Sequence, residues 1–162
     1  MLEDIVQQAG IKSNKSIKIK IEVDCVPPLG FKTEEKLLLR PFSFYVKCFT
    51  RSNLFAGKMH ALLFRKWKNR VKGRDWYDLE WYIKKGIPLN KEHFLQRAKD
   101  TGDWNKKSIT EKQFLKLLRE KINSTSLNKV KEDVVHFVQN DNVLDIWSPD
   151  YFNDLAEKIK FE

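Results

Sequence analysis

A strongly basic stretch from Arg51 to Gly86 constrains the fold of this 162-residue chain more than any other feature of its sequence. The stretch contains ten Lys or Arg residues and three Asp or Glu residues, and so carries +7 of the chain's net charge of +9. Residues 1–50 and 87–162 are close to neutral. A positive field that concentrated attracts phosphates more readily than it serves solubility.

The same stretch has the periodicity of two amphipathic helices. From Leu54 to Lys72, apolar residues recur at helical spacing and predict one buried face. That face would comprise Phe55, Met59, Leu62, Leu63 and Trp67. Gly73 would separate this helix from a second one, which begins near Asp75 and ends at Gly86. The buried face of the second helix would comprise Trp76, Leu79, Tyr82 and Ile83.

Five charged residues of this stretch have spacings that would let them converge on one polyanionic ligand: Lys58, Arg65, Arg74, Asp75 and Asp78. Two interpretations of the carboxylates are open. Asp75 would be a helix N-cap with Asp78 as a first-turn carboxylate, or Asp75 would hold or activate a group in a site with Lys58 and Arg65. For the basic residues, the alternative to a site is a solvated helix face.

Two segments upstream have the patterns of β-strands. Ser16 to Val26 alternates apolar and charged residues, as a half-buried strand does. Glu22 and Asp24 lie on its polar face, where solubility alone would explain them. Phe42 to Phe49 is aromatic and β-branched, which predicts a second strand. The connector from Lys32 to Arg40 has no pattern that assigns its structure. The core-facing residues of the second strand would be Phe42, Phe44, Val46 and Cys48.

Residues 87–162 have the pattern of a helical scaffold. Four further helices are expected, at Glu92–Lys99, from Thr110 onward, at Leu127–Val138 and from Ser148 onward. Their inward residues would be Phe114, Leu117, Leu118, Ile122, Val130, Val134, Phe137, Phe152, Leu155 and Ile159. No motif in this region indicates a chemical role.

These patterns predict an α+β fold in which a small sheet is followed by a helical bundle. We expect a strand region at residues 1–50 and a helical domain at residues 51–162. No run approaches the ~20 apolar residues of a membrane-spanning helix, and the N-terminus lacks the pattern of a signal peptide. Two cysteines do not make a disulfide framework. A cytoplasmic protein with reduced thiols is therefore expected.

The segment FAGKMHALLFRKWKNRVKGRDWYDLEWY resembles the AbiEii/AbiGii family of nucleotidyltransferase toxins. The family pattern has a Lys at a helix start, a basic residue further along, and Arg/Lys-Asp-x-x-Asp at the opening of the next helix. The matching positions here are Lys58, Arg65, Arg74, Asp75 and Asp78. The resemblance runs from about Ile17 to Tyr82 and extends loosely to the C-terminal helices.

The resemblance implies nucleotidyl transfer, in which an acceptor hydroxyl attacks the α-phosphate of a nucleoside triphosphate (NTP) in the presence of Mg²⁺. It implies Lys58, Asp75 and Glu22 as catalytic residues. Glu22 is included because IKIKIEVD looks like the family's carboxylate-bearing strand. Glu22 or Asp24 would be a metal ligand, and the sequence does not separate them. Phosphate- and substrate-binding residues would be Arg65, Arg74 and Asp78. The implied acceptor is RNA, such as tRNA, and the implied partner is a cognate antitoxin.

The family's N-terminal motif is absent from this sequence. That motif is a Gly-Gly or Gly-Ser turn followed by an Asp-x-Asp pair that holds two Mg²⁺ ions, and the nearest match, Glu22-Val23-Asp24, has no glycine turn before it. We therefore expect the C-terminal part of such an enzyme, with a partial nucleotidyltransferase-like sheet and no activity alone. The missing N-terminal half would leave an exposed sheet edge and face, which either another chain or the helical bundle would cover. The alternative is a non-catalytic module that binds a polyanion or a protein.

Overall fold

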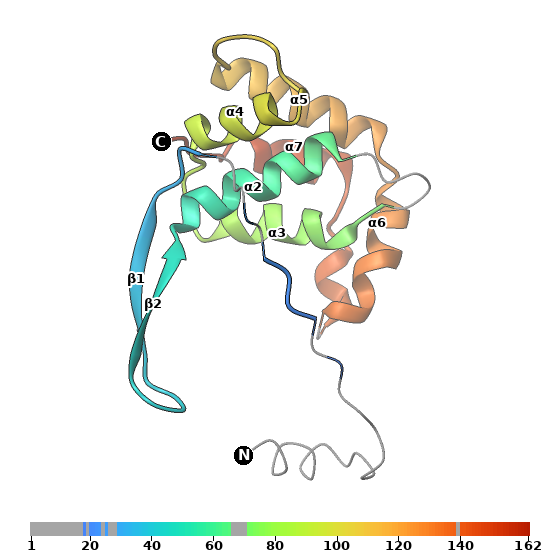
Figure 1. The fold of residues 1–162 in the computed structure, drawn as a ribbon. Helices are drawn as coiled ribbons and strands as arrows, with labels where there is room; N and C mark the ends of the chain where they lie inside the picture. Colours follow the sequence, from blue (N-terminus) through green and yellow to red (C-terminus); the bar gives the residue numbers. More distant parts are fainter. Residues whose placement is uncertain (1–17, 19, 24, 26–28, 66–70, 139) are drawn as a thin grey trace.

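The computed structural model describes residues 18, 20–23, 25, 29–65, 71–138 and 140–162. These residues form an antiparallel hairpin that projects from a bundle of helices (Figure 1). This arrangement confirms the predicted α+β class, with a small sheet before a helical bundle. In chain order the elements are β1 (Thr33–Leu38), β2 (Phe44–Phe49), α2 (Arg51–Phe64), α3 (Gly73–Lys84), α4 (Lys91–Asp100), α5 (Glu111–Ser124), α6 (Leu127–Val134), the 3-10 turns η1 (Val135–Phe137) and η2 (Asp141–Leu144), and α7 (Pro149–Ala156).

The hairpin pairs β1 with β2, from Thr33 opposite Phe49 to Leu38 opposite Phe44. The sequence predicts β2 but assigns no structure to the connector that contains β1. Because β1 has little apolar alternation of its own, its pairing with β2 sets its conformation. The base of the hairpin is tied to the bundle, since the Asn53 side chain on α2 donates to the carbonyl of Lys32 at 3.2 Å.

The prediction that one side of β2 faces the core is wrong. Phe42 is 68% exposed and Phe44 is also exposed, while Val46 and Cys48 are only partly buried. The physical reason is the position of the hairpin, which extends away from the helices that hold the core (Figure 1).

The predicted strand from Ser16 to Val26 lies partly outside the described residues. Its described positions, 18, 20–23 and 25, have no strand structure. Ile21 and Val23 are 83% and 77% exposed. The alternating pattern does not make a strand at these positions, because a strand needs a hydrogen-bonded neighbour and the described part of the chain provides none for them.

Helix α2 ends earlier than its periodicity predicts. Its last residue is Phe64, and Arg65 has an extended backbone with φ −65° and ψ 123°. The predicted helix to Lys72 is therefore wrong at Arg65, and residues 66–70 lie outside the described part of the chain. No Gly or Pro lies between Arg65 and Lys72 to signal the end. The chain turns here because α3 packs back along α2 (Figure 1).

Helix α3 begins at Gly73, two residues before Asp75, close to the predicted start, and Lys72 is its N-cap residue. Gly73 is needed for a close helix contact, because a Cβ atom at this position would lie only 2.4 Å from the carbonyl oxygen of Val130 on α6. The backbone N–H of Gly73 also donates to Asp133 Oδ2 at 2.9 Å. These contacts fix the first turn of α3 against α6.

The helices enclose one apolar core. Its largest fully buried side chains are Phe55, Met59, Trp76, Leu79, Leu89, Phe94, Phe114, Leu118, Ile122, Val130, Val134 and Phe152. The faces predicted from helical spacing supply most of them. Phe137 was expected inside but is 61% exposed. The reason is that α6 ends at Val134 and the chain tightens into η1, which changes the direction of the following side chains.

Helix α3 is also anchored to α7 through Glu80, a buried carboxylate. Glu80 accepts hydrogen bonds from Trp147 Nε1 at 3.1 Å and from the hydroxyl of Tyr151. Lys84 Nζ lies 2.6 Å from the same carboxylate. The charge of Glu80 is thereby compensated, and its hydrogen bond with Tyr151 links α3 to α7.

Candidate functional site

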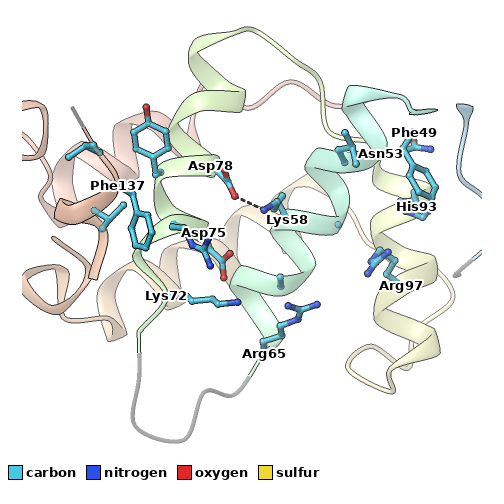
Figure 2. Close-up of a pocket in the computed structure, with 17 residues that line it drawn as sticks. Phe49, Asn53, Lys58, Arg65, Lys72, Asp75, Asp78, His93, Arg97 and Phe137 are labelled. Carbon is cyan, nitrogen blue, oxygen red and sulfur yellow. Dashed lines mark ion pairs between the residues drawn. The ribbon is translucent and has the colours of Figure 1, made fainter. Parts of the chain in front are cut away.

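A cavity of about 590 Å³, here called the α2–α3 cavity, is lined by five cationic side chains and two carboxylates (Figure 2). Part of its wall is aromatic, with Phe49, Tyr77 and Phe137. The charged residues are Lys58, Arg65, Lys72, Arg74, Arg97, Asp75 and Asp78. An excess of positive charge in a concave surface favours an anionic ligand.

The basic stretch supplies most of this charge. Lys58 lies on α2, Arg65 follows its last turn, and Arg74, Asp75 and Asp78 lie in the first two turns of α3. Because α2 and α3 pack side by side, all five residues of the family pattern line one cavity (Figure 2). Their catalytic and binding roles remain predictions.

Lys58 and Asp78 form an ion pair across the cavity, with Nζ 2.7 Å from Oδ2. Both side chains are partly exposed, so water and salt weaken the attraction. The pair fixes the position of the lysine amine at the cavity wall. It also offsets one of the positive charges that a ligand would meet.

Asp75 is buried, with 8% of its surface exposed. Burial raises the pKa of its carboxyl above the ordinary value of 3.8, since the charged form loses hydration. Lys58 and Lys72 oppose this rise, Asp78 adds to it, and Arg65 opposes it. The pKa of the Asp75 carboxyl is thus raised although nearby cations oppose the rise. Such a carboxyl group is well suited to exchange a proton with a ligand.

The interpretation of Asp75 as a helix N-cap is wrong. Lys72 occupies the N-cap position, and the backbone N–H of Asp75 donates to the Lys72 carbonyl at 3.2 Å. Asp75 therefore lies inside the first turn, where its charge interacts favourably with the helix dipole. Asp78 lies one turn further along α3, directed at Lys58 (Figure 2).

Residues from the predicted scaffold also line the cavity, and no sequence pattern pointed to them. Arg97 on α4 packs beside Gly57, where an added Cβ would lie 3.8 Å from the guanidinium carbon. The guanidinium of Arg74 lies 5.1 Å from the ring centroid of Phe137, a cation–π contact. His93 is buried at the end of the α2–α3 cavity where Phe49 lies (Figure 2). Burial lowers the pKa of the His93 side chain.

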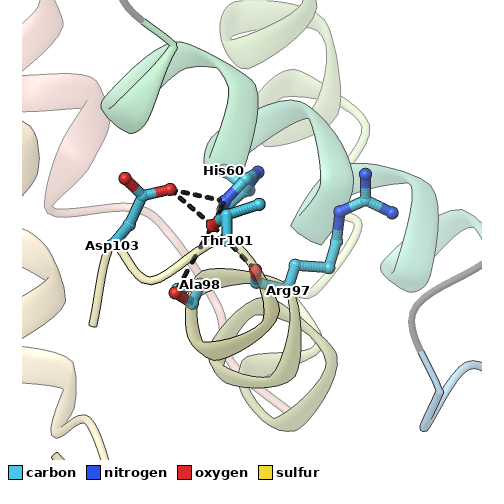
Figure 3. A network of polar contacts seen from close by, with 5 residues as sticks. All are labelled: His60, Arg97, Ala98, Thr101 and Asp103. Carbon is cyan, nitrogen blue, oxygen red and sulfur yellow. Dashed lines mark hydrogen bonds and ion pairs between the residues drawn. The ribbon is translucent and has the colours of Figure 1, made fainter. Parts of the chain in front are cut away.

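A polar network joins α2 to the end of α4 (Figure 3). His60 Nε2 lies 3.0 Å from Thr101 Oγ1 and 3.2 Å from Asp103 Oδ2. Burial lowers the pKa of His60 and Arg97 lowers it further, while the hydrogen bond with Asp103 raises it. The network fixes the helix that carries Arg97 against α2.

The two upstream carboxylates are not brought to this cavity within the described residues. Glu22 is exposed, forms an ion pair with Lys20 and is not among the residues that line the cavity. Asp24 lies outside the described residues. The expected position of Glu22 in the same cleft is therefore not found, because the strand that would have carried it is not formed at its described positions.

The described carboxylates do not fit a Mg²⁺ site. Asp78 is paired with Lys58, and Asp75 is surrounded by cations. Within the described ranges, no group of three or more His, Cys, Asp or Glu side chains is arranged to hold a metal ion. Mg²⁺ requires several oxygen ligands in octahedral geometry. This part of the chain offers cationic side chains to a ligand and does not offer a metal cage.

A comparison with protein families identifies the chain. The family model for the nucleotidyl transferase AbiEii toxin of the type IV TA (toxin–antitoxin) system matches residues 5–157. The chain belongs to the AbiEii family. This confirms the resemblance read from the Lys58–Asp78 block and extends it through the C-terminal helices. Searches of curated proteins and of solved structures found no match.

The AbiEii family is one of nucleotidyltransferase toxins, and its type IV system implies a cognate antitoxin. None of the helices in the described part of the chain is long and apolar enough to span a membrane. The basic helical pair of this AbiEii-family chain thus lines a cationic cavity.

Proposed function

We propose that this AbiEii-family chain binds the phosphates of an NTP in the α2–α3 cavity, for nucleotidyl transfer to RNA in the cytoplasm. The observation that carries the proposal is the set of five cationic side chains around one cavity, against two carboxylates. A triphosphate is compact and strongly anionic. A cavity of about 590 Å³ is also within the size range of small-molecule sites.

The cationic side chains would divide the work of binding. Arg65 and Arg74 would each donate paired hydrogen bonds to phosphate oxygens, because a planar guanidinium matches their geometry. Lys58 would add a single positive charge, and its ion pair with Asp78 would set the position of its amine. The exposed ring of Phe137 beside Arg74 offers a surface on which a base would stack.

In the proposed reaction, the oxygen of an acceptor hydroxyl forms a bond to the α-phosphorus of the NTP. The bond from this phosphorus to the oxygen that bridges to the β-phosphorus breaks, and pyrophosphate leaves with the electron pair. The hydroxyl proton passes to Asp75, whose raised pKa makes it a better proton acceptor than an ordinary aspartate. The cationic side chains stabilise the charge that develops on pyrophosphate.

The ligands for Mg²⁺ would come from outside the described residues, since these hold no metal-binding group. On this proposal, phosphate binding is a property of the described cavity. Transfer requires the additional carboxylates, and the cognate antitoxin would restrain it. Binding and transfer can therefore be tested separately.

A second candidate function is RNA binding without a reaction. The lack of a metal-ligand group among the described residues favours it. Lys and Arg side chains that contact phosphates bind RNA through counterion release and need no catalytic group. The two functions differ in their smallest ligand, because an RNA surface binds a free nucleotide weakly whereas a nucleotide cavity saturates with one NTP per chain.

Calorimetric titration with each NTP tests the proposal. We expect one site per chain in the wild type. The double variant Lys58→Ala/Arg74→Ala should weaken binding at least about a hundredfold, because each charged hydrogen bond contributes about 1.5–3 kcal/mol. The control is Lys107→Ala/Lys112→Ala, which removes the same charge from two exposed residues outside the cavity. Equal losses in both variants, or no NTP binding, would overturn the proposal.

A further inference from the structure

A second cavity, of about 640 Å³, adjoins the α2–α3 cavity. The two cavities share part of their lining, namely Ala61, Arg65, Lys72 and Asp75. The remaining wall of the second cavity comes from the end of α2, the end of α5 and the start of α6, together with Val71, Trp76 and Asp103, and we call it the α5–α6 cavity. The proposed NTP binding leaves it unused.

The α5–α6 cavity is also positively charged. It is lined by four cationic side chains and two carboxylates. One of the carboxylates, Asp103, is already engaged by His60 and Thr101. The charged residues are Arg65, Lys72, Lys121, Lys129, Asp75 and Asp103. An anionic ligand is therefore favoured here as well.

Polar residues of the α5–α6 connection line the same cavity. The segment Ser124–Ser126 lines the cavity, and the hydroxyls of Ser124 and Thr125 donate to the carbonyl of Lys121. Ser126 is the N-cap residue of α6, but its side chain makes no capping hydrogen bond, and the first turn of α6 has no acidic residue. The start of a helix carries partial positive charge and suits a phosphate. Lys121 and Lys129 lie on the two helices that meet at this point.

The wall that the two cavities share indicates which ligand would bind in the α5–α6 cavity. Among the described residues, Asp75 is the one carboxylate that lines both cavities. A ligand in the α5–α6 cavity would thus meet a nucleotide in the α2–α3 cavity next to Asp75 and Arg65. In group transfer, donor and acceptor must meet in this way, at the group that takes the proton.

We propose that the α5–α6 cavity binds the phosphodiester backbone of the acceptor RNA strand and presents its hydroxyl at the shared wall. The inference rests on the proposed function, which places the NTP in the α2–α3 cavity. A cavity of about 640 Å³ is within the size range of small-molecule sites, so it admits a short stretch of a single strand. Because the two ligands have separate cavities on this proposal, RNA and NTP bind to the chain at the same time.

The test measures RNA and NTP binding separately on the full chain. Fluorescence anisotropy with a labelled single-stranded RNA oligonucleotide gives RNA affinity across a salt series, and calorimetry gives NTP affinity. The variant Lys121→Ala/Lys129→Ala removes cations that line only the α5–α6 cavity. Its matched control is Lys112→Ala/Lys116→Ala, which removes two exposed lysines of α5 that line neither cavity.

The Lys121→Ala/Lys129→Ala variant should weaken RNA binding on the order of tenfold. Its log–log salt slope should flatten by about 1.4, since each single-strand phosphate contact contributes about 0.7. Its NTP affinity should stay within about twofold of the wild type, because the substitutions remove contacts to RNA phosphates and leave the lining of the α2–α3 cavity intact. The control variant should leave both affinities unchanged. Circular dichroism of both variants would confirm that they fold alike.

Two results would overturn the inference. One is an equal loss of RNA affinity in the two lysine variants, and the other is displacement of RNA by NTP, which would mean that one ligand occupies both cavities. These results are distinct from a failure of the proposed function. If the wild type binds no NTP, the proposed function fails, whereas normal NTP binding with equal RNA losses overturns only the acceptor site.

Discussion

Lys58 Nζ on α2 lies 2.7 Å from Asp78 Oδ2 on α3, so one ion pair joins the two helices that form the cavity (Figure 2). The two side chains are 46% and 29% exposed, and a pair so open to solvent adds little to stability. Its effect is on the cavity itself. A phosphate that binds Lys58 must compete with the carboxylate of Asp78 for the same amine.

The substitution Asp78→Asn should therefore tighten phosphate binding. It removes a negative charge from the cavity and releases the amine of Lys58. At ion-pair distance, the interaction between two single charges contributes about 1 kcal/mol in water. This free energy corresponds to a roughly fivefold increase in phosphate affinity. Calorimetry with an NTP measures the change. The free energy of unfolding should fall by less than about 1 kcal/mol. Weaker NTP binding in a variant of unchanged stability would contradict this account of the ion pair.

The substitution Asp75→Asn should stabilise the protein at neutral pH. A carboxyl whose pKa is higher in the folded chain favours folding when protonated, so its contribution is lost as pH rises from about 3.8 through the raised pKa. The substitution Asp75→Asn removes the charge of this side chain, so the variant does not lose this stability as pH rises. Urea unfolding at a series of pH values should show the variant more stable than the wild type near neutral pH, with the difference disappearing below pH 3.8. A difference that does not change with pH would exclude a raised pKa.

The substitution Gly73→Ala should lower the free energy of unfolding by about 1–3 kcal/mol, because the new Cβ would overlap the Val130 carbonyl on α6. Gly57→Ala is the matched control in a neighbouring helix. There the nearest atom would be an Arg97 side-chain atom at 3.8 Å, an ordinary contact, and the helix propensity of Ala would add up to about 1 kcal/mol. Urea denaturation compares the two. Similar effects of both substitutions would show that close packing at Gly73 is not needed.

The purified chain should not transfer nucleotides by itself. Its sequence contains no Asp-x-Asp pair, and the described residues contain no group of metal ligands. The measurement is incubation with each labelled NTP, Mg²⁺ and total tRNA, followed by separation of the RNA. Incorporation that grows with time and with protein concentration would contradict the expectation.

Local patterns were sufficient to predict most of the helices and their buried faces. Phe55, Trp76 and Phe114 are buried as their helical spacing predicts, because side chains three or four positions apart share one face of any helix. The concentration of charge and the order of Lys58 and Asp75 along the chain are also local properties. The block from Lys58 to Asp78 also carries the resemblance to the AbiEii family, which the family comparison confirms.

The remaining features depend on which surfaces meet when the chain packs. Arg97 enters the cavity because α4 packs along α2, and nothing near it in the sequence marks it. The conformation of β1 comes from its partner strand, and the need for glycine at position 73 comes from α6. Spacing along one helix fixes the direction of its side chains but not the neighbour that they face. The cavity, the burial of Asp75 and its raised pKa therefore arise only from the packing of helices distant in sequence.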